Sequence, residues 1–258
     1  MHEYLLPMIV AAFVAACASL LGSFAILKRM ALVGDALSHV ALPGIAIALM
    51  LRINPFLGGA AVLVVTVIGI WLVEYKSSLS LDTIVGVFFT ASLAIGALIM
   101  PEQELIEALF GNIMELGAVE SALSIVMSIA LIVAIIFIHK RLTLSMVSAD
   151  MAHSIGIKTR RLELAYLLIF AFAVTLGIRF VGALLMGSLV IIPAASAKNI
   201  AKSLNAFMSL SVIFGVAAAA AGIYVSYTRA LPPGPVFILI SSMIFIASLA
   251  VRQARKAA

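Results

Sequence analysis

Charged residues are scarce in this sequence. Only 10% of its 258 residues are Asp, Glu, Lys or Arg, whereas 65% are hydrophobic. A water-soluble domain usually carries about a quarter charged residues. The chain lacks a polar face large enough to dissolve it, and no polar stretch is long enough for a soluble domain. The sequence therefore predicts a protein that crosses a membrane several times.

Cysteine and several catalytic motifs are also scarce or missing. The single Cys17 excludes a disulfide framework, a cysteine-based metal site and a paired-thiol redox centre. The sequence has no G-x-x-x-x-G-K-[ST] loop, no H-E-x-x-H and no G-x-S-x-G. The chain therefore cannot hydrolyse a nucleotide in the P-loop manner by itself, and we expect no enzyme activity of its own.

The apolar runs lack the period-two alternation of membrane barrel strands. They have the length of about 20 residues that a helix needs to cross an ~30 Å hydrocarbon layer. We therefore expect an all-α, polytopic membrane protein with eight or nine transmembrane helices, as one domain over residues 1–258. The count depends on the short seventh segment. The predicted segments are 4–27, 31–51, 56–73, 81–100, 121–138, 162–180, 183–197, 206–226 and 235–251.

The basic residues predict the orientation of the chain. With nine alternating spans and the N-terminus outside, 13 of the 16 Lys and Arg residues face inward, and only Arg52, Arg179 and Arg229 face outward. This bias follows the positive-inside rule. The net charge of +5 therefore marks the cytoplasmic side and does not indicate a nucleic-acid partner.

Acidic residues gather in the predicted outer segment PEQELIEALFGNIMELGAVE. This segment is either an ordinary solvated loop or a negative vestibule that concentrates cations or docks a basic partner. Its acidic residues are Glu102, Glu104, Glu107, Glu115 and Glu120.

Asp35 and His39 stand four residues apart in GDALSHVALPG, inside an otherwise apolar segment. Residues at this spacing share one face of a helix, with Cβ atoms roughly 5–6 Å apart, so that both side chains can reach one ion. A charge at the centre of a membrane helix costs about 2.5–3.5 kcal/mol. Residues of this kind usually face a cavity or a partner and mark an ion or proton path.

The pair allows three interpretations: a structural contact, a proton relay or a divalent-cation site. The cation site is favoured because Asp with His suits zinc, manganese or ferrous iron better than an alkali ion. Two ligands are too few for a closed tetrahedral site, which suits an ion that must be released. A two-fold dimer with the path on its axis would bring two such pairs together.

Small residues and proline surround the pair. Gly34, Ser38, Pro43 and Gly44 allow close approach of neighbouring helices and a break in this helix. Such residues occur in many polytopic proteins, so this signal is weak alone.

A segment at about residues 145–160 lies on the predicted inner side and is not a span. Ser148 can cap a short helix through Asp150 and His153, and Gly156 can end it. This helix either lies along the membrane surface or docks into the groove of a cytoplasmic partner. Asp150 and His153 could in principle bind metal, but capping and docking are favoured beside solvent.

Several stretches of the chain resemble the metal-ion ABC transporter permeases of the ABC-3 family, and most closely its zinc permeases. They cover about residues 20 to 250 and include GSFAILKRMALVGDALSHVALPGIAIAL, LDTIVGVFFTASLAIGALI, SADMAHSIGIKTRRLELAY and GIYVSYTRALPPGPVFIL. The run VGALLMGSLVIIPAASA, with Gly182 and Pro193, is specific when it occurs together with the Asp-x-x-x-His pair.

The resemblance implies an importer permease of the metal and vitamin B12 type in a bacterial inner membrane. It implies a homodimer of this permease, two cytoplasmic ATPase subunits that bind ATP, and an extracytoplasmic metal-binding protein. It places the metal path at Asp35 and His39, and the helix that couples to the ATPase around Asp150, Ala152 and Gly156. No cofactor is expected to stay bound, and the transported ion is zinc, or alternatively manganese or iron.

Two other functions compete with this one. A gradient-driven cation carrier without an ATPase would need further ionisable residues in the spans, and Asp35 is the only carboxylate expected deep within one. A receptor or structural scaffold would leave the Asp35–His39 pair without a role.

Overall fold

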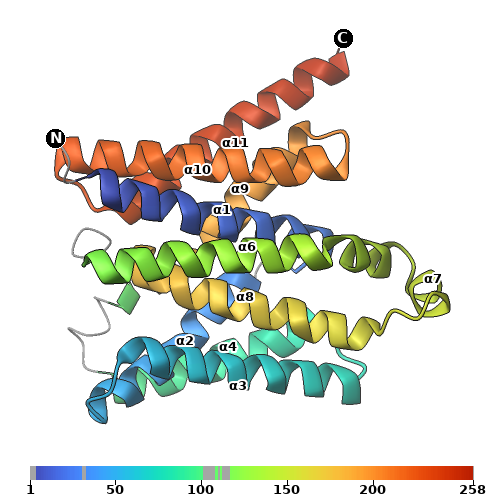
Figure 1. Cartoon of the computed structure of the whole chain (residues 1–258), viewed down its shortest axis with the longest axis horizontal. Helices are drawn as coiled ribbons and strands as arrows, with labels where there is room; N and C mark the ends of the chain where they lie inside the picture. Colours follow the sequence, from blue (N-terminus) through green and yellow to red (C-terminus); the bar gives the residue numbers. More distant parts are fainter. Residues whose placement is uncertain (1–3, 31–32, 101–107, 110, 112–116, 258) are drawn as a thin grey trace.

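The computed structural model of the chain describes residues 4–30, 33–100, 108–109, 111 and 117–257. Helices are the only regular elements in this part of the chain, and they form one elongated bundle (Figure 1). The predicted all-α fold is therefore confirmed. The helices are α1 Leu5–Leu27, α2 Val33–Met50, α3 Pro55–Lys76, α4 Leu81–Ile99, α6 Ala118–Val147, α7 Ala149–Ser154, α8 Thr159–Val181, α9 Ala183–Ile200, α10 Leu204–Arg229 and α11 Pro233–Ala257.

Each apolar segment of the sequence forms one long helix. Eight of the described helices are long and apolar enough to span a membrane, and the chain is a multi-pass membrane protein. The predicted segment 183–197 is α9, a helix of 18 residues that packs against α1, α2, α10 and α11. The start of α1 and the end of α11 lie at opposite ends of the bundle (Figure 1).

The connections that the charge pattern assigns to the inner side lie together at one end of the bundle. The α3–α4 and α9–α10 connections, α7 and the end of α11 all lie on the right in Figure 1. Basic residues therefore gather at this end, which is called the basic end below.

Of the predicted acidic vestibule, Glu102, Glu104, Glu107 and Glu115 lie outside the described residues. Glu120 lies in the first turn of α6 and accepts a hydrogen bond from the Gly117 backbone N–H at 3.3 Å.

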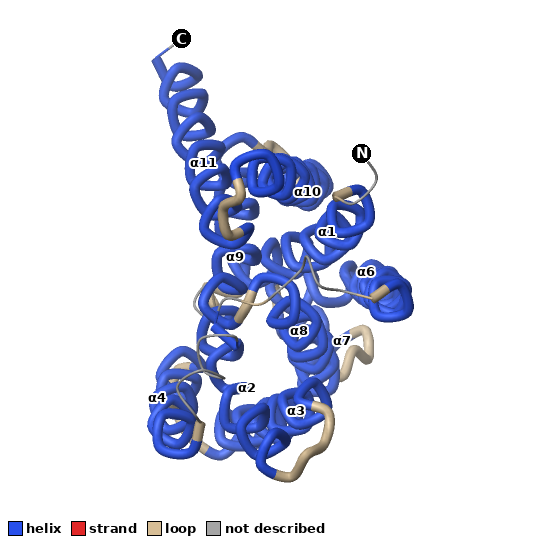
Figure 2. The backbone as a smooth tube through the Cα atoms, turned by 90° about the vertical axis from the view of Figure 1, so that its left-hand side faces the viewer, coloured by secondary structure: helices blue, strands red, loops and turns tan. Residues whose placement is uncertain are grey.

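Helices α1 and α2 form the centre of the fold. In their most apolar stretches, 78% of the α1 residues and 72% of the α2 residues are buried, whereas the share is 39% or less in α3, α4, α6, α10 and α11. Helix α2 packs against α3, α4, α8 and α9, and Figure 2 shows it beside these helices when the bundle is viewed along its length. The helix with Asp35 and His39 is therefore enclosed by other helices of the same chain.

Glycine brings α2 and α3 into backbone contact. A Cβ atom on Gly44 would lie 2.3 Å from the Gly58 carbonyl oxygen, and a Cβ atom on Gly58 would lie 2.3 Å from the Gly44 carbonyl oxygen. Both distances are far below any normal contact, so this crossing requires glycine on both helices. This crossing uses the close backbone approach that Gly44 allows.

The break in the helix that Pro43 would allow does not occur. Helix α2 runs without interruption from Val33 to Met50 with Pro43 inside it, and α9 is likewise continuous through Pro193. Membrane helices tolerate an internal proline because neighbouring helices and small local adjustments satisfy the freed backbone groups. The sharp turn lies instead at Gly182, between α8 and α9, where a φ of 78° favours glycine.

We predict that Gly44→Ala destabilises the protein by about 1–3 kcal/mol, because an added methyl group overpacks the α2–α3 crossing. Thermal unfolding of the detergent-purified protein measures this loss. Gly86→Ala in α4 is the matched control, because its Cβ atom would meet nothing within 4 Å. The control should unfold at the wild-type temperature or slightly above it, since alanine favours helix. Equal unfolding temperatures for both variants would contradict the tight crossing.

Candidate functional site

Asp35 and His39 point toward each other from one face of α2. The His39 Nε2 atom lies 4.0 Å from the Asp35 Oδ1 atom. Oxygen and nitrogen ligands bind transition metals at about 2.0–2.2 Å, so one ion between these two atoms can contact both without a backbone movement. Asp35 and His39 therefore share one face of α2 in the folded chain, as their four-residue spacing predicted.

The two side chains differ in exposure. The Asp35 side chain is 44% exposed, whereas that of His39 is 11% exposed. The His39 ring lies against Phe89 of α4, with the ring centroids 5.5 Å apart. Its Nδ1 atom is buried and has no hydrogen-bond partner among the described residues. A polar atom buried without a partner is costly and usually has a functional reason.

Helix α9 packs directly against Asp35. A Cβ atom on Gly187 would lie 2.7 Å from the Asp35 Cβ atom and 2.8 Å from its Oδ1 atom. The buried Ser38 hydroxyl lies 2.7 Å from the Asp35 carbonyl oxygen and 2.7 Å from the Ala183 carbonyl oxygen, and so links α2 to α9. Gly187 was not among the predicted site residues. Only the folded chain shows that it leaves space for the carboxylate.

Asp35 lies deep in the bundle although it is in the first turn of α2. A Cβ atom on Gly34 would lie 3.3 Å from Val190 and 3.4 Å from Phe170, which lie near the middle of α9 and α8. Helix α2 therefore begins about halfway along its neighbours. The positive end of the helix dipole favours a carboxylate in the first turn, which offsets part of the cost of a charge at this depth. Of the predicted path residues, Gly34 and Ser38 lie beside Asp35, whereas Gly44 lies at the α2–α3 crossing and Gly182 at the turn between α8 and α9.

The described residues supply only two metal ligands at this position. They contain no group of three or more His, Cys, Asp and Glu side chains that could hold a metal ion. Any further ligand of a metal ion bound by Asp35 and His39 must come from outside this set of described side chains.

The predicted short helix on the inner side is α7. The Ser148 hydroxyl accepts a hydrogen bond from the Met151 backbone N–H at 3.2 Å, and Gly156 ends the turn with a φ of 78°. Ala152 is fully buried, whereas Asp150 is exposed. The segment that the resemblance assigned to coupling is therefore anchored by Ala152 and presents Asp150 to solvent.

His153 contacts the first residue of α8. Its Nε2 atom lies 3.3 Å from the Thr159 hydroxyl, at the start of α8.

The start of α8 is held to α3 by an aromatic stack. The Arg160 guanidinium lies 4.2 Å from the centroid of the Trp71 ring and 3.5 Å from that of Tyr75. The Trp71 indole N–H donates to the Arg160 carbonyl oxygen at 3.1 Å. Both rings lie near the end of α3, so the segment directly after α7 is fixed to the helix that crosses α2 at Gly44.

An ion pair between Lys28 and Glu163 holds α8 to the end of α1. The Lys28 ammonium also lies 5.8 Å from the centroid of the Tyr166 ring. Sequence reasoning treated Lys28 and Arg160 only as inner-side charges and missed their contacts. The one available signal was Glu163, an acidic residue at the edge of an apolar segment.

The chain has relatives of known name over most of its length. Residues 1–252 match the ABC 3 transport family. The manganese transport system membrane protein MntC of Listeria innocua is 31% identical over 229 residues, which are 87% of this chain and 82% of that protein. The high-affinity zinc uptake system membrane protein ZnuB of Buchnera aphidicola is 32% identical over 239 residues, 88% of this chain and 90% of that protein.

The fold is also similar to a solved structure. PsaBC from Streptococcus pneumoniae in complex with Fab has a chain that superposes with a TM-score of 0.84 and 26% identity, over 96% of this chain and 91% of that chain. The match over residues 1–252, which includes both Asp35 and α7, shows that this protein belongs to the ABC 3 transport family of metal transport permeases.

Proposed function

We propose that this chain is the permease subunit of an ATP-driven importer of a divalent transition-metal ion, and that Asp35 and His39 bind the ion during its passage. The observation that carries the proposal is the 4.0 Å separation of their ligand atoms at a position deep in the bundle. The names of the MntC and ZnuB relatives, which refer to metal transport, support it.

A homodimer of the permease would complete the metal shell. The Asp35 carboxylate is 44% exposed in the single chain and is therefore open to a second copy. Two pairs of Asp35 and His39 around a two-fold axis would give a four-ligand shell of the kind that zinc prefers. Such a shell forms and opens as the two copies move, which suits an ion that must be released.

The transported ion is proposed to be zinc, with manganese and then iron as alternatives. Equal numbers of imidazole and carboxylate ligands suit zinc, whereas manganese accepts more oxygen ligands. Relatives of the chain are named for both metals, so competition between the ions is needed to choose.

The energy for transport is proposed to come from two cytoplasmic ATPase subunits that contact α7. The absence of a P-loop in this sequence requires a separate ATPase, and the exposed Asp150 makes α7 available for docking. An extracytoplasmic metal-binding protein would deliver the ion at the opposite end of the bundle. This arrangement places the chain in the inner membrane of a bacterium.

Movement of α7 would reach the metal ligands through three contacts. The Arg160 stack joins the start of α8 to α3, and the Gly44–Gly58 crossing joins α3 to α2. The Lys28–Glu163 ion pair joins α8 to α1, which leads directly into α2. A shift of α8 is therefore expected to move the helix with Asp35 and His39.

We predict that Asp35→Asn and His39→Gln each lower metal uptake by the reconstituted complex by about tenfold or more, because loss of a direct ligand costs at least as much as loss of an outer-shell group. Uptake of zinc, manganese and iron, each in competition with the others, is the measurement. Asp82→Asn is the control, because Asp82 is an exposed carboxylate in the first turn of α4. Uptake that stays at the wild-type rate without Asp35 and His39 would exclude this metal path.

We predict that Asp150→Lys abolishes co-purification of the ATPase while the permease remains folded, because the substitution reverses a charge on the exposed face of α7. Pull-down of the ATPase with the tagged permease is the measurement, and Asp82→Lys is the control at the same end. A pull-down that the Asp150 variant leaves unchanged would remove α7 from the docking surface. Metal uptake without any ATPase would instead support a gradient-driven carrier.

We predict that Arg160→Gln uncouples hydrolysis from transport, because it removes the cation between Trp71 and Tyr75. The ATPase should still bind and hydrolyse ATP, while the number of ions imported per ATP falls severalfold. The adjacent, exposed Arg161→Gln is the matched control. An unchanged ratio of ions to ATP in the Arg160 variant would contradict the role of the stack.

A further inference from the structure

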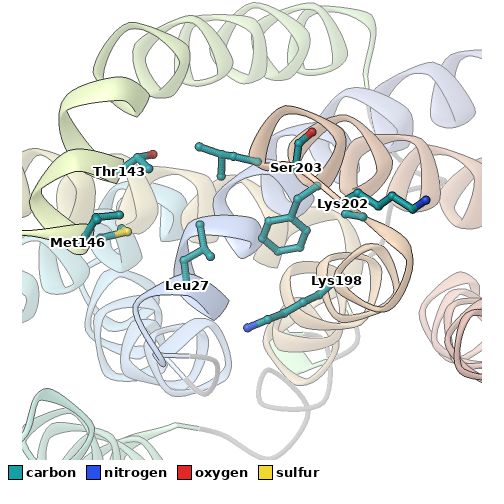
Figure 3. A pocket seen from close by; sticks show the side chains of 10 residues that line it. Leu27, Thr143, Met146, Lys198, Lys202 and Ser203 are labelled. Atoms are coloured by element: carbon teal, nitrogen blue, oxygen red, sulfur yellow. The ribbon is translucent and has the colours of Figure 1, made fainter. Parts of the chain in front are cut away.

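A pocket of about 480 Å³ opens at the basic end of the bundle, away from the metal path. It lies between the ends of α1, α6 and α9 and the start of α10 (Figure 3). Apolar side chains, including Leu27, Met146 and Phe207, form much of its lining. The polar part of the lining includes Lys198 and Lys202.

The two lysines of the pocket carry positive charge that no acidic residue neutralises within the described chain. Both are exposed, and neither takes part in an ion pair there. In Figure 3 the Lys198 side chain extends toward Leu27, whereas the Lys202 side chain extends in the opposite direction, away from Leu27. Lysine side chains are flexible, so Lys198 can reach an anion in the pocket and Lys202 can do so after a change of rotamer.

Further positive charge lies beside the pocket. Arg252 donates to the Asn199 Oδ1 atom at 3.2 Å, and Arg255 donates to the Ile200 carbonyl oxygen at 3.3 Å. Both acceptors are neutral, so the two guanidinium charges stay uncompensated by these contacts. Helix α10, with 26 residues, begins at the pocket and directs the positive end of its dipole there. The site is therefore suited to an anion.

The apolar lining distinguishes the expected anion from a soluble one. Inorganic phosphate would gain nothing from Leu27, Met146 or Phe207. Outside the pocket, α6 exposes Phe137 at 81% and α10 exposes Ile213 at 56%, and these side chains are suitable surfaces for acyl chains. Helix α7 packs against α6 and α8, whereas the pocket lies on the side of α6 toward α1 and α10. The pocket is therefore separate from the proposed ATPase docking surface.

We propose that this pocket binds the headgroup of one anionic phospholipid from the cytoplasmic leaflet, with its phosphodiester between Lys198 and Lys202. Basic pockets between membrane helices on the cytoplasmic side suit such headgroups. The bound lipid bridges the end of α6 and the start of α10 across α1. Because Val147 at the end of α6 is followed by α7, the lipid also steadies the base of that helix.

The test uses the full chain in zwitterionic detergent micelles, titrated with phosphatidylglycerol or with phosphatidylcholine. Native mass spectrometry gives the lipid bound per chain, and thermal unfolding gives the stabilisation. Wild-type protein should retain one phosphatidylglycerol and should unfold at a higher temperature with it, but not with phosphatidylcholine. Lys198→Gln combined with Lys202→Gln should weaken this binding roughly tenfold or more, and Lys198→Arg combined with Lys202→Arg should restore it.

Arg29→Gln combined with Lys76→Gln removes two exposed positive charges from the same end outside the pocket and should leave binding unchanged. If this control loses as much phosphatidylglycerol binding as the double Lys→Gln variant of the pocket, the lipid is attracted by the overall positive charge of this end, and the proposed site is overturned. Equal protection by inorganic phosphate would show a soluble-anion site and would also overturn it. Wild-type affinity in the double Gln variant would exclude the two lysines as the headgroup ligands. All comparisons use the shift caused by lipid, so a lower baseline stability of a variant does not affect the conclusion.

Discussion

The carboxylate of Asp35, placed deep among apolar helices, is the constraint on which the site depends. An ionised group at this depth needs compensation, and the chain supplies it by starting α2 near the middle of α8 and α9, so that the helix dipole faces the carboxylate. Gly187 supplies the space and the Ser38 hydroxyl links the two backbones. Within the described part of the chain no Lys or Arg forms an ion pair with this carboxylate, so none competes there with a metal ion.

Close backbone contact makes this arrangement possible. Lipid offers no hydrophobic drive for helices to associate, so small residues that allow tight packing must replace it. A Cβ atom on Gly22 would lie 1.9 Å from the Val190 carbonyl oxygen, and the Gly44–Gly58 crossing is similarly close. These contacts join α1 to α9 and α2 to α3. The helices around Asp35 therefore move as packed pairs, each with little freedom of its own.

Local sequence signals predicted the parts of the molecule that depend on local structure. The apolar runs gave the helices, the spacing of Asp35 and His39 gave their common face, and Ser148 with Gly156 gave the limits of α7. Contacts between distant segments could not be predicted, because they depend on which helices become neighbours. Gly187 and the Arg160 stack belong to this group. Helix α6 extends beyond the predicted end at residue 138, because a helix need not stop where the apolar run ends.

Tight glycine contacts surround α2, whereas charged and aromatic contacts hold α8 at the basic end. This distribution explains how the chain can keep Asp35 and His39 together while its helices move. The contacts of Gly187 with Asp35 and of Gly44 with Gly58 leave no room for a Cβ atom on these glycines, so the ligand geometry is preserved when α2 moves. At the basic end, α8 is held to α1 by Lys28 and Glu163 and to α3 by Arg160 on Trp71. Charged and aromatic contacts of this kind can slide and re-form, because their energy changes gradually with distance. A displacement that begins at α7 can therefore tilt α2 as a unit, and the two ligands change their surroundings while they stay together.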